Sequence, residues 1–502
     1  MKKLTYRKVF QTEDEFFSHK LDQCSFRVYR FLRTKLSRVW PLKEHQVCFF
    51  QAEDRHGQAS SEMPKGFDYA TSQEVDGTIT LKYIDIFDFL PKEDVDAFKK
   101  KLRHFVTSNK RPSFAPAFFE KDEDRITDMG RYFDGCAFAS LCAVEFLHNP
   151  FLSENGSKVM VSIRNLSSSF ALMRYRLFVS KPFSSEVENC LKKEYDPYND
   201  VCKQFGTPWY KPWKFGISYY SGDDARQKAV MSKLSLLKWE FYREIKRYLG
   251  MHFADAQLFP PVFFTYSTNI RPNSKCYNAN FWNSIGLDYF ADYSQKYNLC
   301  ICSVQDKNDR TGMELLALCG EKTVQNEFYP EYAEYYLPDS YSTYLVANAI
   351  RQVAEREIVD SNKVISRTIL RGNTSQLLKT RASVERKLYY CYRFLNEFSG
   401  NTLEKDVFTD FVNPGIKNGS ISEKRMEGFP SHVKETKTKI DNILKLLNDV
   451  AEFEISKTNM AVQRIMIIIT ILSLIIALLT LLFSNGSLGT IIKSVFSCFI
   501  SS

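Results

Sequence analysis

The sequence predicts an α/β or α+β cytosolic domain at the N-terminus, then long helices, and then a stalk helix that continues into a C-terminal transmembrane helix. Three observations predict this order. Short apolar or alternating segments occur up to about residue 335, long helical segments begin at about residue 340, and residues 465–483 form an uncharged apolar run. With 502 residues, the chain has room for two or three domains and a sizeable core.

Residues 1–335 form the predicted cytosolic region, in one or two domains, with a regulatory or ligand-binding role. Its strand candidates are short, apolar or alternating, and rich in β-branched and aromatic residues. The predicted strands are 46–52, 77–87, 158–165, 170–179, 262–268, 298–304 and 314–319. The predicted helices are 93–107, 135–147 and 224–249.

Residues 340–431 form the predicted helical region. Two helices, 342–370 and 374–398, are separated by the breaker pair Gly372-Asn373. A loop follows, and the last helix is expected to begin near His432 and to run unbroken to residue 483. The residues that mark the loop are Gly400, Pro414, Gly415, Gly419, Gly428 and Pro430.

Residues 432–464 form the predicted stalk, and its apolar residues recur at steps of seven, three, four and three. These steps make a heptad seam, which is too narrow to be stable alone and needs a partner helix. We expect the partners to be other copies of the chain in a homo-oligomer; the alternative is packing on helix 374–398 of the same chain. The seam residues are Val433, Ile440, Ile443, Leu447 and Val450.

Residues 465–483 form the predicted transmembrane helix, because nineteen residues carry no charge. At about 1.5 Å per residue they span close to the ~30 Å hydrocarbon core. Basic residues precede this run, the last of them Arg464, and only Lys493 follows it. The positive-inside rule therefore places the N-terminal bulk in the cytoplasm and the helix among the lipids of the inner or plasma membrane.

Residues 484–502 contain a second apolar run, 488–500, which is thirteen residues long and carries Lys493. This run is too short for an ordinary membrane span. Three interpretations remain open: a short second membrane helix that lines a pore, a helix at the membrane interface, or a tail without a partner role.

Composition and motifs favour a non-enzymatic protein. Charged residues make up 25% and hydrophobic residues 44%, which is typical of a globular chain, and the net charge of +9 is spread along it, so no direct DNA or RNA binding is expected. The sequence contains no recognisable catalytic or phosphate-loop motif. The pair Cys300 and Cys302 is interpreted as buried core, while the acidic clusters 120–124 and 223–224 could hold a hard cation such as Mg²⁺ or form solvated loops.

Two stretches could bind an anionic, aromatic ligand. In residues 170–181, Arg174 and Arg176 share one strand face, with Arg164 on a neighbouring strand, and guanidinium groups suit phosphate oxygens. In residues 208–220, aromatic side chains alternate with lysines, a composition that can stack a base. The alternatives are an exposed sheet face for the first and core or interface packing for the second. The residues singled out in the second stretch are Trp209, Lys211, Trp213 and Lys214.

In the apolar run and the residue directly after it, four hydroxyl residues fall at steps of three, seven and four, which places them on one helical stripe. Such a stripe suits water or a neighbouring helix, so these residues are predicted to line a pore; helix–helix packing alone is the alternative. The pore candidates are Thr470, Ser473, Thr480, Ser484 and, just beyond the run, Asn485.

The segment EISKTNMAVQRIMIIITILSLIIALLTLLF at 454–483 resembles the junction in the CorA magnesium-transporter superfamily where a polar stretch runs into the pore helix. The resemblance implies a pentamer whose cytosolic domain controls a membrane pore, with Asn485 as a polar group at its mouth. Family members carry Gly-Met-Asn there, followed by a full second span; here residues 483–487 read FSNGS. The layout with its enlarged N-terminal region resembles more closely the divergent CorA-type proteins encoded beside CRISPR systems, and this resemblance implies a membrane effector triggered by a nucleotide messenger.

The sequence therefore favours a CorA-like oligomeric channel or effector, gated by a ligand such as a nucleotide messenger and acting in antiviral defence. A divalent cation transporter for magnesium is the second hypothesis, weakened by the missing Gly-Met-Asn. A tail-anchored cytosolic enzyme or scaffold is the third, weakened by the absence of a recognisable catalytic motif.

Overall fold

The computed structural model divides the chain into two compact units, Met1–Val353 with Arg393–Glu435, and Ala354–Tyr392 with Thr436–Ser502. The residues that the structure describes are 78–109, 122–134, 137–203, 215–269, 285, 291–294, 296, 298–304, 313–320, 337–371, 374–398, 410–413, 419–484, 489–490 and 494.

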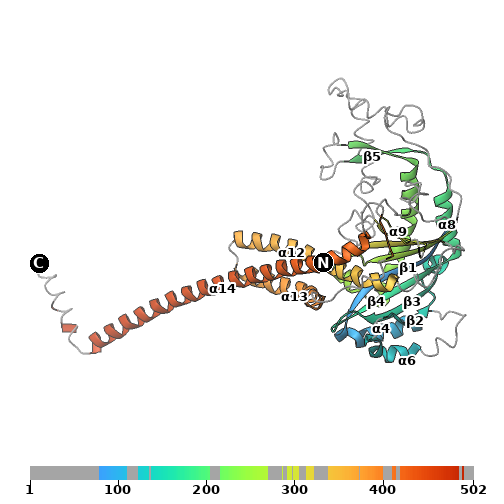
Figure 1. Ribbon diagram of the computed structural model, residues 1–502. Coiled ribbons are helices and arrows are strands. Elements are labelled where there is room, and N and C mark those ends of the chain that lie inside the picture. Colours follow the sequence, from blue (N-terminus) through green and yellow to red (C-terminus); the bar gives the residue numbers. More distant parts are fainter. Residues whose placement is uncertain are drawn as a thin grey trace, which may run out of the picture. The chain divides into compact units, whose positions relative to one another are not determined.

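The first unit contains a mixed eight-stranded sheet in the order β2-β3-β4-β1-β7-β10-β9-β8 (Figure 1). All neighbouring strands are antiparallel except β7 and β10, which run parallel. A separate antiparallel pair joins β5 and β6. The strands are β1 Ile79–Pro91, β2 Ala139–Val144, β3 Gly156–Asn165, β4 Phe170–Val179, β5 Tyr198–Lys203, β6 Phe215–Tyr220, β7 Val262–Thr268, β8 Asp292–Ser294, β9 Leu299–Val304 and β10 Glu314–Gly320.

One face of the large sheet is packed against helices and forms the main core. Tyr175 and Leu177 of β4 belong to this face, and they are buried with Phe105 of α4, Val187 of α8 and Phe241 of α9. Cys300 and Cys302 of β9 lie in the same core, as their spacing indicated. The helical segments before β7 are η2 Lys92–Asp94, α4 Val95–Ser108, α6 Asp122–Thr127, η3 Met129–Asp134, α7 Pro150–Asn155, α8 Lys181–Lys192, α9 Gly222–Tyr248 and α10 His252–Asp255.

Three long helices follow the sheet: α12 Leu337–Arg371, α13 Thr374–Phe398 and α14 Ile421–Ser484. The second unit contains the later part of α12, most of α13 and α14 from Thr436 onwards. Ile440, Ile443 and Leu447 of the predicted heptad seam are buried there. The seam is therefore covered within one chain, so an oligomer is not needed to explain these three residues.

Two predicted elements are wrong. The predicted helix 135–147 contains strand β2, which pairs with β3. Residues Leu141 to Val144 are all buried, and a strand buried on both faces has a continuous apolar run that resembles a buried helix in sequence. The predicted strand 46–52 lies outside the described residues.

The second error concerns the start of the last helix, which begins at Ile421 rather than near His432. Gly428 and Pro430 were assigned to a loop, but both lie inside α14. Proline weakens a helix because it lacks the backbone N–H, yet its neighbour Phe429 is buried and the helix is firmly capped at its start. The burial of Phe429 and the cap therefore outweigh the low helix propensity of Gly428 and Pro430.

Candidate functional site

The three arginines predicted to bind an anion lie on the sheet face opposite the main core. Arg174 is opposite Ser162 in the β3–β4 register, and Arg176 is opposite Asp85 of β1, so Arg164, two residues after Ser162, shares their face. Their exposed fractions are 7% for Arg164, 2% for Arg174 and 1% for Arg176. The alternative of an exposed sheet face is therefore wrong.

The protein itself supplies hydrogen-bond partners to all three guanidinium groups. Arg176 donates from Nε and Nη2 to the two carboxylate oxygens of Asp85, both at 2.7 Å. Arg174 donates to Asp339 of α12 at 2.9 Å, and Arg164 donates to the hydroxyls of Ser342 and Thr343. These bonds connect the beginning of α12 to the sheet.

The electrostatics of this arginine cluster follow from burial. Burial lowers the pKa of Arg174 to about 10, and the positive charge of Arg176 contributes in the same direction. For Arg176 burial also opposes the charge, but attraction and hydrogen bonding to Asp85 outweigh it and raise the pKa. Burial raises the pKa of Asp339, although Arg174 acts against it. The ring of Phe138 lies 4.2 Å from the guanidinium of Arg174 and adds a cation–π contact.

The second predicted ligand stretch, residues 208–220, ends in strand β6. Trp209, Lys211, Trp213 and Lys214 lie outside the described residues. A ligand role for them stays a prediction, as it does for the three arginines.

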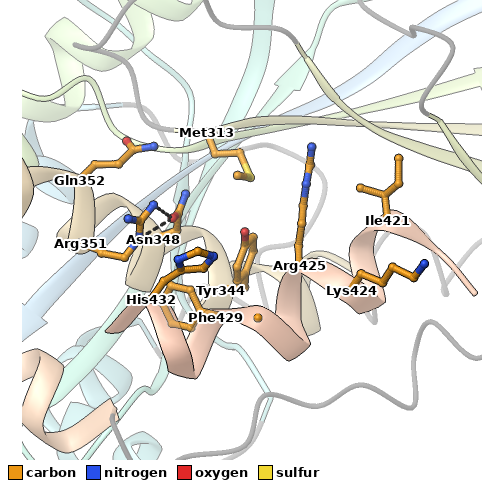
Figure 2. Close-up of a pocket in the computed structure, with 11 residues that line it drawn as sticks. Met313, Tyr344, Asn348, Arg351, Gln352, Ile421, Lys424, Arg425, Phe429 and His432 are labelled. Carbon is orange, nitrogen blue, oxygen red and sulfur yellow. Dashed lines mark hydrogen bonds between the residues drawn. The ribbon is translucent and has the colours of Figure 1, made fainter. Parts of the chain in front are cut away.

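A cavity of about 460 Å³ lies between α12 and α14 (Figure 2). It has a basic wall: Arg351 comes from α12, and Lys424, Arg425 and His432 come from α14. Within the part of the chain that the structure describes, no aspartate or glutamate lines it. The other lining residues are Met313, Tyr344, Asn348, Gln352, Ile421, Gly428 and Phe429.

The cavity has one fixed guanidinium and an aromatic pair. The side-chain oxygen of Asn348 accepts hydrogen bonds from Nε and Nη2 of Arg351 at 3.2 and 3.0 Å, drawn as dashed lines in Figure 2. The rings of Tyr344 and Phe429 meet edge to face, with centroids 5.2 Å apart. Burial raises the pKa of Tyr344, and the positive charges of Arg425 and Arg351 oppose this rise. The phenol is therefore neutral at physiological pH.

Sequence reasoning missed this cavity, although a signal was present. Tyr344, Asn348 and Arg351 are spaced by four and three residues, and Arg425, Phe429 and His432 repeat the same spacing. Each set forms one face of a helix. The second face was not recognised because residues up to 431 were assigned partly to a loop.

Beside the cavity, the N-terminus of α14 is already occupied by a carboxylate. Asp292 of β8 is buried and accepts hydrogen bonds from the backbone N–H groups of Ile421 and Ser422, each at 2.8 Å. Ser420 adds a side-chain cap on the N–H of Glu423 at 3.0 Å. The anion site that a helix N-terminus usually offers is thus filled by the protein.

Within the described residues, one helical segment, Ile455–Thr480, is long and apolar enough to cross a membrane, and none of its most apolar stretch is buried. The hydroxyls of Thr470 and Thr480 donate to the carbonyls of Met466 and Ile476, at 2.8 and 2.7 Å. These bonds satisfy the hydroxyls inside an apolar solvent, so both residues are compatible with lipid as well as with a pore.

The remaining pore candidates are Ser473, Ser484 and Asn485. Ser473 lies within the apolar segment, and Ser484 is the last residue of α14. Asn485 lies outside the described residues, as does most of the second apolar run, 488–500. Their pore roles stay predictions.

The acidic clusters show no metal-binding geometry in the part of the chain that the structure describes, where no group of three potential ligands occurs. Glu123 accepts a hydrogen bond from Arg103 at 2.5 Å, and Asp224 forms a capping box with Ser221 at the start of α9. Magnesium binding stays a prediction.

No protein-family model, curated protein or solved structure matches this chain. The resemblance to the CorA superfamily therefore rests on the sequence features described above.

Proposed function

We propose that this protein is a ligand-gated membrane channel or effector, anchored by α14 with its N-terminal bulk in the cytoplasm. The observation that carries the proposal is the make-up of α14, since one helix contributes Lys424, Arg425 and His432 to a basic cavity and also contains the apolar segment Ile455–Thr480. In this proposal, a ligand that binds the first turns of α14 acts on the helix that also carries the membrane segment.

The proposed mechanism is a shift between two arrangements of α14, which acts as a stalk continuous with the membrane segment. A ligand moves such an equilibrium only by binding one arrangement more tightly than the other. Moving it from 1:99 to 99:1 requires about 10⁴-fold tighter binding, or about 5.5 kcal/mol. Two or three charge-assisted hydrogen bonds formed in one arrangement alone supply this amount, at roughly 1.5–3 kcal/mol each.

A single apolar helix cannot enclose a pore, so the proposal includes a homo-oligomer, a pentamer by resemblance to CorA proteins. The oligomer places the stripe with Thr470, Ser473 and Thr480 towards the pore and the leucines and isoleucines towards lipid. Because Gly-Met-Asn is absent, we favour a channel or effector in antiviral defence over a selective magnesium transporter.

Reconstitution tests this proposal. The full chain is inserted into liposomes loaded with a fluorescent dye and a magnesium indicator, and nucleotides are titrated on the cytosolic side. We expect release of contents that depends on ligand, and the relative rates for dye and magnesium distinguish an effector from a transporter. If a correctly inserted protein releases neither under any condition, α14 is only a tether and the N-terminal domain acts as an enzyme or scaffold.

A further inference from the structure

The cavity between α12 and α14 carries the positive charge that a binding site for a polyanion requires. Arg351, Lys424 and Arg425 are cationic side chains, and among the described residues that line the cavity none is a carboxylate. Asp292 caps α14 beside the cavity, and its carboxylate is engaged by the backbone N–H groups of Ile421 and Ser422. A ligand with a single negative charge would leave this wall with excess positive charge.

The geometry favours phosphate groups among the polyanions. Arg351 and Arg425 come from different helices, and planar guanidinium groups bind phosphate oxygens with paired hydrogen bonds. Asn348 holds the guanidinium of Arg351 in place before any ligand arrives, which reduces the entropy lost on binding.

The size of the cavity favours a ligand larger than inorganic phosphate. Its volume of about 460 Å³ lies within the range of roughly 300–1,000 Å³ that small-molecule sites occupy. Met313, Tyr344 and Phe429 supply apolar lining, while the side-chain amide of Gln352 adds a polar group. A lining that combines cationic with apolar and aromatic side chains suits a molecule that carries both phosphates and a planar, less polar group.

We propose that this cavity binds a soluble phosphate ester of the size of a nucleoside di- or triphosphate. This cavity is the site for the ligand that the proposed gating function requires. Only the effect of binding on the membrane rests on that function. Binding itself requires only the first unit, to which the described lining residues belong.

A larger side chain at position 428 can fill the cavity and leave its cationic side chains in place. Gly428 lies in α14, and a Cβ atom added there would have His432 Nε2 as its nearest neighbour, at 3.8 Å. Since leucine is a good helix former, Gly428→Leu is expected to fold and to occupy ligand space. Arg425→Gln removes one charge from the wall, and Lys445→Gln makes the same change on an exposed part of α14 outside the cavity.

The test is calorimetric titration of the full chain in detergent with pyrophosphate, ATP and a short-chain phosphatidylinositol phosphate. We expect pyrophosphate or ATP to bind wild type and Lys445→Gln equally. Binding should be at least about 10-fold weaker in Arg425→Gln, the effect of losing one charge-assisted hydrogen bond, and absent in Gly428→Leu. The melting temperature of each variant shows that it is folded.

The outcomes separate this proposal from the gating function. Failure of pyrophosphate and ATP to bind, or equal binding by folded Gly428→Leu, overturns the site. Binding of the lipid alone overturns a soluble ligand as the source of the phosphate. Binding that requires the cavity but causes no release from liposomes supports the site and contradicts the gating function.

Discussion

The carboxylate of Asp292 holds Ser422 by two hydrogen bonds, from the backbone N–H at 2.8 Å and from the hydroxyl at 2.5 Å. Asp292 lies on β8, a short strand at the edge of the sheet, and Ser422 lies in the first turn of α14. The same carboxylate accepts from the N–H of Ile421. This contact therefore fixes where α14 begins relative to the sheet.

Asp292→Asn is expected to destabilise the N-terminal unit by about 2 kcal/mol. The amide keeps the shape but loses the charge at the helix N-terminus, and one of its two polar atoms can no longer accept a hydrogen bond. At roughly 2–4 °C per kcal/mol for a domain of this size, the melting temperature should fall by about 4–8 °C. Thermal unfolding followed by circular dichroism measures the change. Ser422→Ala, which removes only the hydroxyl bond, should have a smaller effect, and equal melting temperatures for Asp292→Asn and wild type would contradict this cap.

Arg176→Met is expected to cost about 3–5 kcal/mol, because it leaves the carboxylate of Asp85 buried without its cation. The double variant Arg176→Met with Asp85→Leu removes both charges and should recover most of that loss. Denaturant unfolding of the two single variants and the double variant forms a double-mutant cycle. Additive effects would show that the two residues do not stabilise each other.

Stability is expected to depend on the protonation of His252. Burial lowers the pKa of this imidazole, but hydrogen bonds and attraction from Asp88 and Asp94 outweigh burial and raise it above the usual value of 6.5. Because the folded-state pKa is the higher one, the stabilisation is fully present below pH 6.5 and is lost as pH rises through the folded-state pKa. Melting temperatures across this range should fall more for wild type than for His252→Gln. Parallel curves for the two proteins would show that this imidazole is not responsible.

The sequence predicted elements well where the side-chain period was clear. The predicted strands 170–179 and 262–268 coincide with β4 and β7. In β4, the apolar residues Tyr175 and Leu177 alternate with Arg174 and Arg176, so the pattern has the period of a strand even though both faces are buried.

Prediction failed where long-range packing decides the structure. The pairing of β2 with β3 converts a helix-like apolar segment into a strand, and the cap from Asp292 begins α14 eleven residues before His432. The cap joins residues 130 positions apart, so no local pattern could show it. For the same reason the cavity was not predicted, since Arg351 and Arg425 line one cavity only after α12 and α14 pack together.

Ser473→Leu is expected to change ion leakage through reconstituted protein, because it replaces the central hydroxyl of the proposed pore stripe with a large apolar side chain. Ile475→Leu is the matched control, since two residues further on the side chain points to the opposite side of the helix. Ion flux from liposomes measures both variants. Equal leakage for wild type and Ser473→Leu would remove the stripe from the pore.

Breaking α14 between the basic cavity and the apolar segment is the sharpest test of the proposed coupling between ligand and membrane. Asn448 and Asp449 are exposed residues that lie between Lys424 of the cavity and the apolar segment. Changing them to Gly and Pro interrupts the helix at a cost of about 3 kcal/mol or more, and changing them to two alanines preserves it. In liposomes, we expect ligand-dependent release for wild type and for the alanine variant. The Gly-Pro variant should still bind ligand, but its release should no longer depend on ligand. Unchanged ligand-dependent release in the Gly-Pro variant would contradict the proposed coupling.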